Sequence, residues 1–208
     1  MVMNKLSVAI LGSTRGTDME GVVNAIRRGE LDAEIVLVIS DREDAYILKR
    51  AKDYGIPAIF INPKEFQKRE DFDEKIAEKL EENGVDLILL IGYMMILSAP
   101  FVRKYKNRIM NIHPSLLPAF AGGMDLDVHK VVLEHGIKIT GCTLHFVDEG
   151  TDTGPIILQE AVKVEEEDTP ESLKKRVQEA EQKVIVEGIR LFQKGQIKVE
   201  GGRVRIFK

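Results

Sequence analysis

The sequence lacks several features that would place a protein in a specialised class. It contains one cysteine, Cys142, among its 208 residues, so no disulfide can form within the chain. Lysine and arginine together number 30 against 34 aspartates and glutamates, which leaves a net charge of −4. Surfaces that bind nucleic acid or anionic membranes need an excess of basic residues. The balance therefore argues against both kinds of surface, although it leaves room for one phosphate in a local pocket.

Long apolar runs are also missing. The longest apolar stretch, residues 87–102, is interrupted by Gly92, Ser98 and Pro100, whereas a transmembrane helix needs about 20 apolar residues. We interpret it as a buried strand followed by an apolar turn. Residues 1–12 hold a short apolar run without the small-residue cleavage site of a signal peptide. We therefore expect a cytoplasmic protein.

No spacing typical of a metal site occurs. The four histidines and the single cysteine form neither an H-x₃-H nor a C-x-x-C pattern. The chain has no internal repeat and no low-complexity tract, and α/β domains often reach this length. The sequence thus predicts no metal site and a single domain over residues 1–208.

What the chain does contain is an alternation of short apolar runs and longer amphipathic stretches. Most of the runs are continuous rather than alternating, which is typical of strands covered on both faces. Strand–helix–strand repetition predicts an α/β fold with an open, doubly wound, mostly parallel sheet. The expected strands are residues 6–11, 33–39, 58–61, 87–91 and 108–112, and the expected helices are residues 19–28, 43–54 and 69–82.

The pattern changes after Pro118. Thr169 and Ser172 can cap a long helix, and a Gly-Gly pair between two alternating runs near the end of the chain indicates a C-terminal hairpin. In order, we expect a loop at residues 121–127, a short helix at 129–135, strands at 139–147 and 155–164 joined by a polar turn, a helix ending at Gln193, and a hairpin over 197–207.

The loop after the first expected strand, residues 12–18 (GSTRGTD), opens the first expected helix. Backbone N–H groups and the positive end of a helix dipole at such a place suit a phosphate. The loop matches neither the G-x-G-x-x-G nor the G-K-[S/T] motif. A tight turn with Thr17 or Asp18 as N-cap is the alternative; phosphate binding is favoured because ligands lie beyond the carboxyl ends of such strands. Asp41, after the second strand, is interpreted as a turn or cap residue rather than a ribose ligand.

Two further segments carry polar residues that could react. In residues 111–118 (NIHPSLLP), a period of two puts Asn111 and His113 on one side of a strand, offering an amide and a base that titrates near neutral pH. A buried histidine satisfied by a backbone carbonyl is the structural alternative. Residues 148–155 (DEGTDTGP) either form an exposed turn or bring a carboxylate that orients the ring. Residue types alone leave both questions open.

Taken together and in this order, these segments resemble those of the folate-dependent glycinamide ribonucleotide formyltransferases of purine synthesis. The resemblance covers residues 5–195 and is most specific at residues 111–118, at 141–149 (GCTLHFVDE) with 152–155, and at 92–98 (GYMMILS). It implies a Rossmann-like formyltransferase fold, with a nucleotide-binding half over residues 1–100 and a catalytic and folate-binding half over 101–208. It also implies 10-formyltetrahydrofolate as the formyl donor and a phosphorylated ribonucleotide amine as the acceptor.

The resemblance assigns roles to individual residues, with His145 close to the active centre. It implies that Asn111, His113 and Asp152 are catalytic. The resemblance also implies two sets of ligand-binding residues. Those that bind the nucleotide substrate are Arg15, Gly16, Thr17, Asp18, Arg69, Gln178 and Glu181. Those that bind folate are Met94, Met95, Ile96, Leu97, Val147, Asp148 and Glu149.

Several alternatives share part of this pattern. A formyltetrahydrofolate hydrolase would use the same three residues and deliver the formyl group to water, but usually has an extra N-terminal domain, whereas this sequence begins at its first strand. Another small amine could be the acceptor; methionyl-tRNA would need a basic face. A non-catalytic nucleotide-binding module and a nicotinamide-dependent oxidoreductase belong to other classes, and the missing glycine motif counts against the second. We expect small-molecule partners, no nucleic acid, no membrane, and a monomer or homodimer.

Overall fold

The computed structural model describes residues 5–123 and 125–207, with the backbone alone for residues 125–127. The chain divides into two compact units, Met1–Asn111 and Ile112–Lys208. The expectation of a single domain with two functional halves stays a prediction.

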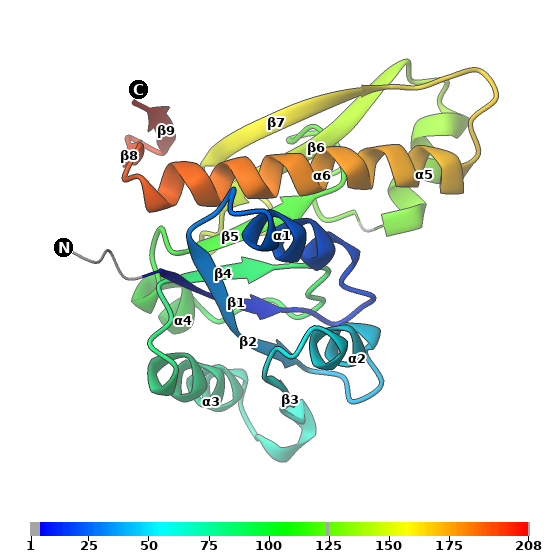
Figure 1. Cartoon of the computed structure of the whole chain (residues 1–208). Helices are drawn as coiled ribbons and strands as arrows, with labels where there is room; N and C mark the ends of the chain where they lie inside the picture. The colour runs from blue at the N-terminus through cyan, green and yellow to red at the C-terminus, as the bar shows by residue number, and fades with distance from the viewer. Residues whose placement is uncertain (1–4, 124, 208) are drawn as a thin grey trace. The chain divides into compact units, whose positions relative to one another are not determined.

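Five parallel strands form the sheet of the first unit (Figure 1). β1 (Leu6–Leu11) pairs with β2 (Ala33–Ser40) on one side and with β4 (Leu87–Leu90) on the other. β3 (Ala58–Phe60) lies beyond β2, and β5 (Ile109–His113) lies beyond β4. The chain thus builds outward from β1 twice, in opposite directions, which confirms the predicted doubly wound parallel arrangement.

The two central strands, β1 and β4, are covered on both faces. Consecutive side chains of a strand point to opposite faces, yet all side chains of residues 8–11 and 87–90 are buried. Such strands need continuous apolar runs. This is why the apolar pattern located them in the sequence.

The helices of the first unit differ from the prediction mainly where they are short. They are α1 (Thr17–Arg27), α2 (Tyr46–Asp53), α3 (Arg69–Glu82) and α4 (Ala99–Lys104), with a 3₁₀ turn at Pro63–Glu65. α3 has its predicted bounds, and α2 begins three residues later than predicted. The apolar turn predicted near residue 100 is wrong, because the chain is helical there from Ala99, with Pro100 in the first turn. Six residues are too few to show a helical period.

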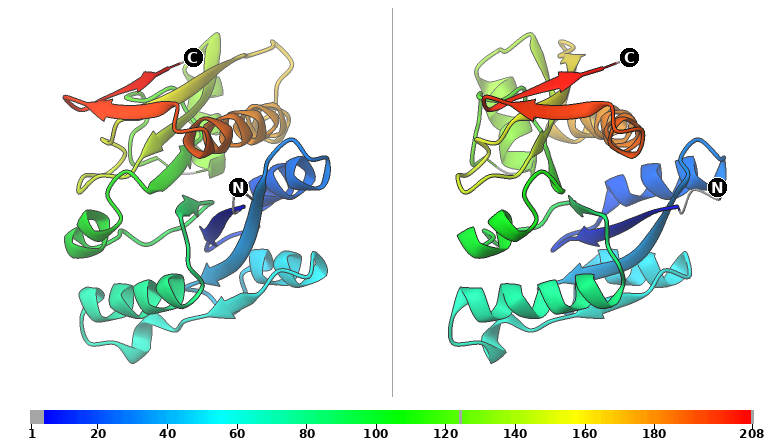
Figure 2. Two further views of the ribbon diagram at one scale, coloured as in Figure 1. Left: turned by 60° about the vertical axis from the view of Figure 1, so that its left-hand side comes forward. Right: turned by 90° about the vertical axis from the view of Figure 1, so that its left-hand side faces the viewer.

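The second unit holds an antiparallel pair, β6 (Ile139–Phe146) and β7 (Ile156–Lys163), which makes the strands of the whole chain mostly rather than wholly parallel. α6 (Pro170–Gln193) packs on both strands and on α5 (Asp125–Glu134), which begins four residues earlier than predicted. Thr169 and Ser172 form the predicted capping box of α6. β8 (Ile197–Glu200) and β9 (Arg203–Ile206) form the predicted C-terminal hairpin, red in Figure 2.

The helices of the described residues were also compared with the length and hydropathy that a membrane span requires. None of them is both long and apolar enough to cross a membrane.

Candidate active site

Asp152 lies between two buried histidines in the second unit. Its Oδ2 atom is 3.4 Å from Nδ1 of His113, the last residue of β5, and its Oδ1 atom is 3.6 Å from Nε2 of His145 on β6. The backbone N–H of Gly122 donates to Oδ2 at 2.8 Å. Both histidines are buried, and the Asp152 side chain is 13% exposed. The structure thus brings His113, Asp152 and His145 together.

Each histidine ring faces an oxygen atom at both of its nitrogens. Nε2 of His113 is 3.1 Å from the carbonyl oxygen of Phe120, and Nδ1 of His145 is 2.9 Å from that of Phe146. A neutral imidazole has one N–H and one lone pair, so it can donate to only one of two oxygen neighbours, whereas an imidazolium donates to both. A carboxylate between two such rings stabilises the imidazolium form of either ring, so a ring can take up a proton beside it and release it again.

Burial sets the resting charge of this group. It lowers the pKa of His113 from 6.5 and outweighs the opposite effect of the Asp152 carboxylate. The pKa of Asp152 is lowered from 3.8, chiefly by hydrogen bonding to His145 and against the effect of burial. At neutral pH the site therefore holds an ionised Asp152 beside a neutral His113, a combination suited to accepting a proton.

The turn between β6 and β7 holds Asp152 in place. Oδ1 of Asp148 accepts hydrogen bonds from the N–H of Gly150 at 3.0 Å and from the hydroxyl of Thr153 at 2.7 Å. A Cβ atom on Gly154 would lie 1.7 Å from the carbonyl oxygen of Phe146, so only glycine allows the turn to return so closely to β6. Asp152 itself has a left-handed φ of 54°. This turn fixes both the place and the direction of the carboxylate.

A buried network holds the segment that follows His113. The hydroxyl of Thr143 donates to the carbonyl oxygen of Ser115 at 2.7 Å and accepts from the N–H of Leu117 at 3.0 Å. The amide of Gln159 donates to the carbonyl oxygen of Leu117 at 3.1 Å. The peptide bond from Leu117 to Pro118 is cis. β6 and β7 thus define the path by which the chain leaves β5.

Asn111 lies two residues before His113 on β5. Its backbone is in register with Leu90 of β4, and its side chain is half-buried. Strand alternation puts the side chains of Asn111 and His113 on the same side of β5. The catalytic role of the three residues stays a prediction.

The loops that follow β1, β2 and β4 meet through the hydroxyl of Ser13. This hydroxyl donates to Oδ1 of Asp41 at 2.5 Å and accepts from the N–H of Met94 at 2.8 Å. The N–H of Ser13 donates to the carbonyl oxygen of Gly92 at 3.0 Å. Asp41 is therefore a turn residue that holds another loop, and the loop with the predicted phosphate ligands is joined to the loop with the predicted folate ligands.

The predicted phosphate ligands surround the first turn of α1. Gly16 is the N-cap of α1, with a left-handed φ of 64° and no side-chain cap, so the alternative with Thr17 or Asp18 as N-cap is wrong. Asp18 is buried in the first turn, and Arg15 is exposed. The helix start thus presents backbone N–H groups beside an exposed arginine, as a phosphate requires.

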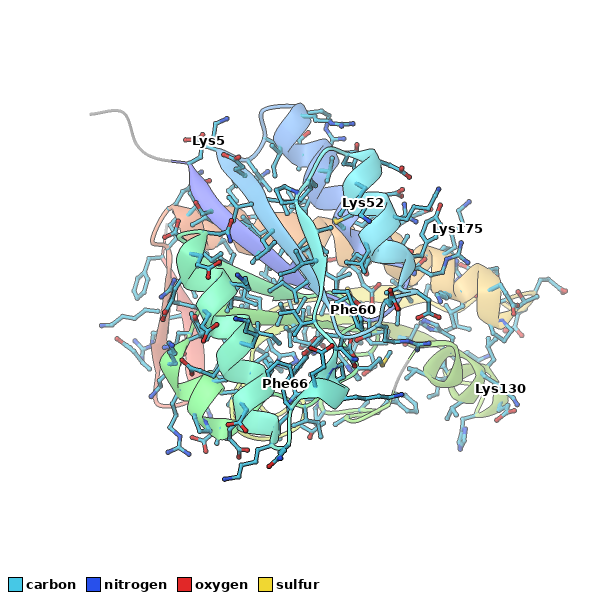
Figure 3. All side chains as sticks on the ribbon, turned by 90° about the horizontal axis from the view of Figure 1, so that it is seen from below. Lys5, Lys52, Phe60, Phe66, Lys130 and Lys175 are labelled. Carbon is cyan, nitrogen blue, oxygen red and sulfur yellow. The ribbon has the colours of Figure 1, made fainter. Side chains whose placement is uncertain are left out.

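Arg69 lies at the start of α3 in a dense group of side chains. Its guanidinium is 5.0 Å from the ring centroid of Phe72, and Phe66, labelled in Figure 3, meets that ring edge-on. Nη2 of Arg69 is 2.9 Å from Oδ1 of Asp73, whose other oxygen accepts the N–H of Ser98 at 2.6 Å. Asp73 therefore connects Arg69 to the end of the predicted folate segment.

Tyr93 contributes a hydroxyl next to this group. Burial raises the pKa of Tyr93, and the nearby Arg69 only partly opposes this. The hydroxyl therefore stays protonated at neutral pH.

The remaining predicted ligands differ in exposure. Met94 is 37% and Ile96 74% exposed, Met95 is half-buried and Leu97 is buried. In the second unit Val147 is half-buried and Glu149 is exposed. Gln178 and Glu181 lie three residues apart on α6, so they share one face of the helix, with Glu181 buried. No geometry tests their ligand roles, which stay predictions.

Residue-type reasoning left out the contacts of His145 and Ser13. His145 is the second-last residue of β6, which leads into the turn with Asp152, so the hairpin connection itself could have indicated their proximity. The meeting of Ser13 with Asp41 follows from parallel pairing of β1 with β2, because both residues stand just beyond the carboxyl ends of these strands. Within the part of the chain that the structure describes, no group of three or more histidine, cysteine or acidic side chains could hold a metal ion.

Comparison with known proteins gives the same family throughout. The family model described as formyl transferase matches residues 6–189. The trifunctional purine biosynthetic protein adenosine-3 of Gallus gallus is 45% identical over 97% of this chain and 20% of that protein. This chain thus spans about a fifth of the length of such trifunctional relatives. The phosphoribosylglycinamide formyltransferase of Bacillus subtilis is 37% identical, over 84% of this chain and 88% of that protein.

Solved structures agree with these relatives. Glycinamide ribonucleotide transformylase 1 from Symbiobacterium toebii has a TM-score of 0.93 and 44% identity, over 99% of this chain and 96% of that one. A formyltetrahydrofolate deformylase from Pseudomonas syringae has a TM-score of 0.88 and 26% identity, over 99% of this chain and 67% of that one. The fold and the sequence together show that the chain belongs to the formyl transferase family.

Proposed function

We propose that the chain transfers the formyl group of 10-formyltetrahydrofolate to the amine of glycinamide ribonucleotide, a step of de novo purine biosynthesis. The observation that carries the proposal is the buried pairing of His113 with Asp152 in a chain of the formyl transferase family. Relatives named for this reaction match it over most of their own length. The enzyme acts in the cytoplasm on small molecules, as a monomer or homodimer, and without a metal ion.

The reaction forms one bond and breaks one. The amine nitrogen of the acceptor attacks the formyl carbon, and negative charge builds up on the formyl oxygen. The bond from that carbon to the folate nitrogen then breaks, the amine loses a proton and the folate nitrogen gains one. Asn111 donates a hydrogen bond to the developing oxyanion, a contribution whose loss typically costs about 10²–10³ in rate.

His113 and Asp152 carry the proton between the two nitrogens. A neutral His113 can accept the proton that the amine loses, because burial keeps its pKa low. The imidazolium that forms lies 3.4 Å from the Asp152 carboxylate, which stabilises it until the folate nitrogen takes the proton, directly or through water. Such proton transfer contributes about 10²–10⁴ in rate.

The nucleotide is bound by the residues around the start of α1 and by residues of two other helices. Arg15, Gly16, Thr17 and Asp18 receive the phosphate, where the backbone N–H groups and the helix dipole favour an anion. Arg69, Gln178 and Glu181 contribute further polar contacts to the nucleotide. The residues proposed as folate ligands are 94–97 in the first unit and 147–149 in the second.

Hydrolysis of the formyl donor is the second candidate, because the chain is also similar to a formyltetrahydrofolate deformylase. Both reactions start from the same donor, so the acceptor decides between them. The purified chain is incubated with 10-formyltetrahydrofolate, with and without glycinamide ribonucleotide, and loss of the formyl group is followed. Loss that depends on the acceptor supports transfer. Equal loss without the acceptor supports hydrolysis, and no loss refutes both.

A further inference from the structure

Helix α2 binds two consecutive carbonyl groups of the loop after β1. The N–H of Ile47 donates to the carbonyl oxygen of Thr14 at 3.1 Å, and Nε of Arg50 donates to that of Arg15 at 3.1 Å. In a planar trans peptide the C=O and the N–H that follows it point in opposite directions. The N–H groups of Arg15 and Gly16 therefore point away from α2.

The loop rests directly on α2 as well. A Cβ atom on Gly16 would lie 2.3 Å from Cγ1 of Ile47, and one on Gly12 would lie 2.6 Å from Cδ1 of the same side chain. Gly16 also has a left-handed φ of 64°, which glycine adopts without strain. Packing against Ile47 thus fixes how close the loop lies to α2, while the two hydrogen bonds fix how its peptide planes are turned.

Arg50 is itself held rigidly. One Nη atom pairs with the carboxylate of Glu20 on α1, and the guanidinium lies 5.2 Å from the ring centroid of Tyr46. Its side chain is only 15% exposed. Because Glu20 balances its charge, Arg50 acts on the loop through the direction of its hydrogen bond rather than as a free positive charge.

We propose that Arg50 is a positioning residue that sets the affinity for the acceptor phosphate, by turning the N–H groups of Arg15 and Gly16 toward it. The proposal rests on the proposed function of the loop. Successive N–H groups that point to one side bind anions well, and the positive end of the α1 dipole adds to them. Arg50 does not touch the phosphate or the reacting atoms.

The decisive variant is Arg50→Lys, which keeps the positive charge. A single ammonium nitrogen cannot donate to the carbonyl oxygen of Arg15 and to Glu20 from two fixed positions, as the guanidinium does. We expect the KM for glycinamide ribonucleotide to rise about tenfold, the effect of one lost hydrogen bond to a charged group. The kcat and the KM for 10-formyltetrahydrofolate should stay within about twofold of wild type, because the change leaves the reacting groups intact.

Two matched variants distinguish an effect of the Arg50 hydrogen bond on the acceptor KM from an effect of nearby charge. Lys49→Ala changes the neighbouring residue of α2, which is 65% exposed and also lies near the Tyr46 ring, but binds no loop carbonyl. Glu20→Gln removes the partner charge and leaves the bond from Arg50 to Arg15. We expect both to keep the wild-type KM for the acceptor. Lys52, on the exposed side of α2 (Figure 3), offers a second control.

The possible outcomes are distinct. An acceptor KM near wild type in Arg50→Lys overturns the proposal, and so does a fall in kcat with both KM values unchanged, which indicates general damage. Glu20→Gln leaves the positive charge of Arg50 unbalanced. A lower acceptor KM in this variant would also overturn the proposal, because the charge of Arg50 rather than its hydrogen bond would then set the affinity. If wild type shows no acceptor-dependent turnover, the proposed function fails instead. In that case inorganic phosphate serves as the probe. We expect it to raise the unfolding temperature of Arg50→Lys less than that of wild type, and this difference still tests whether Arg50 sets the affinity of the loop for phosphate.

Discussion

Replacing Asp152 by asparagine tests the proposed proton route most directly. The side chain keeps its shape, and its remaining oxygen can still accept the N–H of Gly122 that is now 2.8 Å from Oδ2. What the variant loses is the negative charge 3.4 Å from His113 and 3.6 Å from His145. We expect kcat to fall by about 10²–10⁴, the range for a lost general acid–base group.

Loss of stability cannot explain a fall of that size. The fold lowers the pKa of Asp152 below 3.8, so the ionised carboxylate stabilises the folded state above that pH, and this contribution is lost as the pH falls through the folded pKa. Asparagine removes it at all pH values. One lost charge-assisted hydrogen bond is worth about 1.5–3 kcal/mol, against about 5–15 kcal/mol for a whole domain. The protein therefore stays folded, with an unfolding temperature lower by about 3–12 °C.

The pH profile of the variant gives a second, independent sign. A neutral His113 must accept the proton, so activity should fall on the acid side as the pH drops through its pKa, which lies below 6.5. Without the Asp152 carboxylate the imidazolium loses a stabilising charge, and the pKa of His113 decreases further. The acid limb of kcat/KM should therefore move to lower pH while the rate falls. Activity near that of wild type, or an acid limb that moves to higher pH, would refute the reasoning.

Three further predictions concern the segments that hold the site. Ser13→Ala should raise the KM for folate several-fold and leave kcat nearly unchanged, because the N–H of Met94 loses its acceptor. Steady-state kinetics checks this, and a lower kcat at an unchanged KM would contradict it. Asp73→Ala should lower the free energy of unfolding by about 1.5–3 kcal/mol, as measured by urea denaturation, because the partly exposed Arg69 loses its partner and the N–H of Ser98 loses a charged acceptor. Gly154→Ala should reduce kcat and stability together, since a Cβ there would lie 1.7 Å from a carbonyl oxygen; a stable, fully active variant would show that the turn is not needed.

Much of the fold was predictable because buried positions require apolar residues, and these form recognisable patterns in the sequence. Strands that are covered on both faces must be apolar throughout, and residues 8–11 and 87–90 are buried without exception. The capping box of Thr169 and Ser172 was predictable because its partners are three residues apart. α4 was missed because it has six residues, too few for a period.

The candidate site was predictable in its residues but not in its contacts. Three polar segments and their order were enough to indicate the family, yet no local pattern relates Ser13 to Asp41 or Arg50 to Arg15, which are 28 and 35 residues apart. Such contacts depend on which strands are neighbours and on how one loop lies against the next helix. Sequence spacing carries that information only after the strand order is known.

The two interpretations of His113 that residue types left open are both supported by its contacts, and they depend on each other. The carbonyl oxygen of Phe120 lies 3.1 Å from Nε2, as it would beside a purely structural histidine, and Asp152 lies near Nδ1. The burial that requires the carbonyl contact is the same burial that lowers the pKa of His113. A ring held this way is neutral at rest, oriented from one side, and faces a carboxylate that stabilises it once a proton arrives. A general base that works near neutral pH needs these properties together, so the structural contact of His113 supports its catalytic role instead of excluding it.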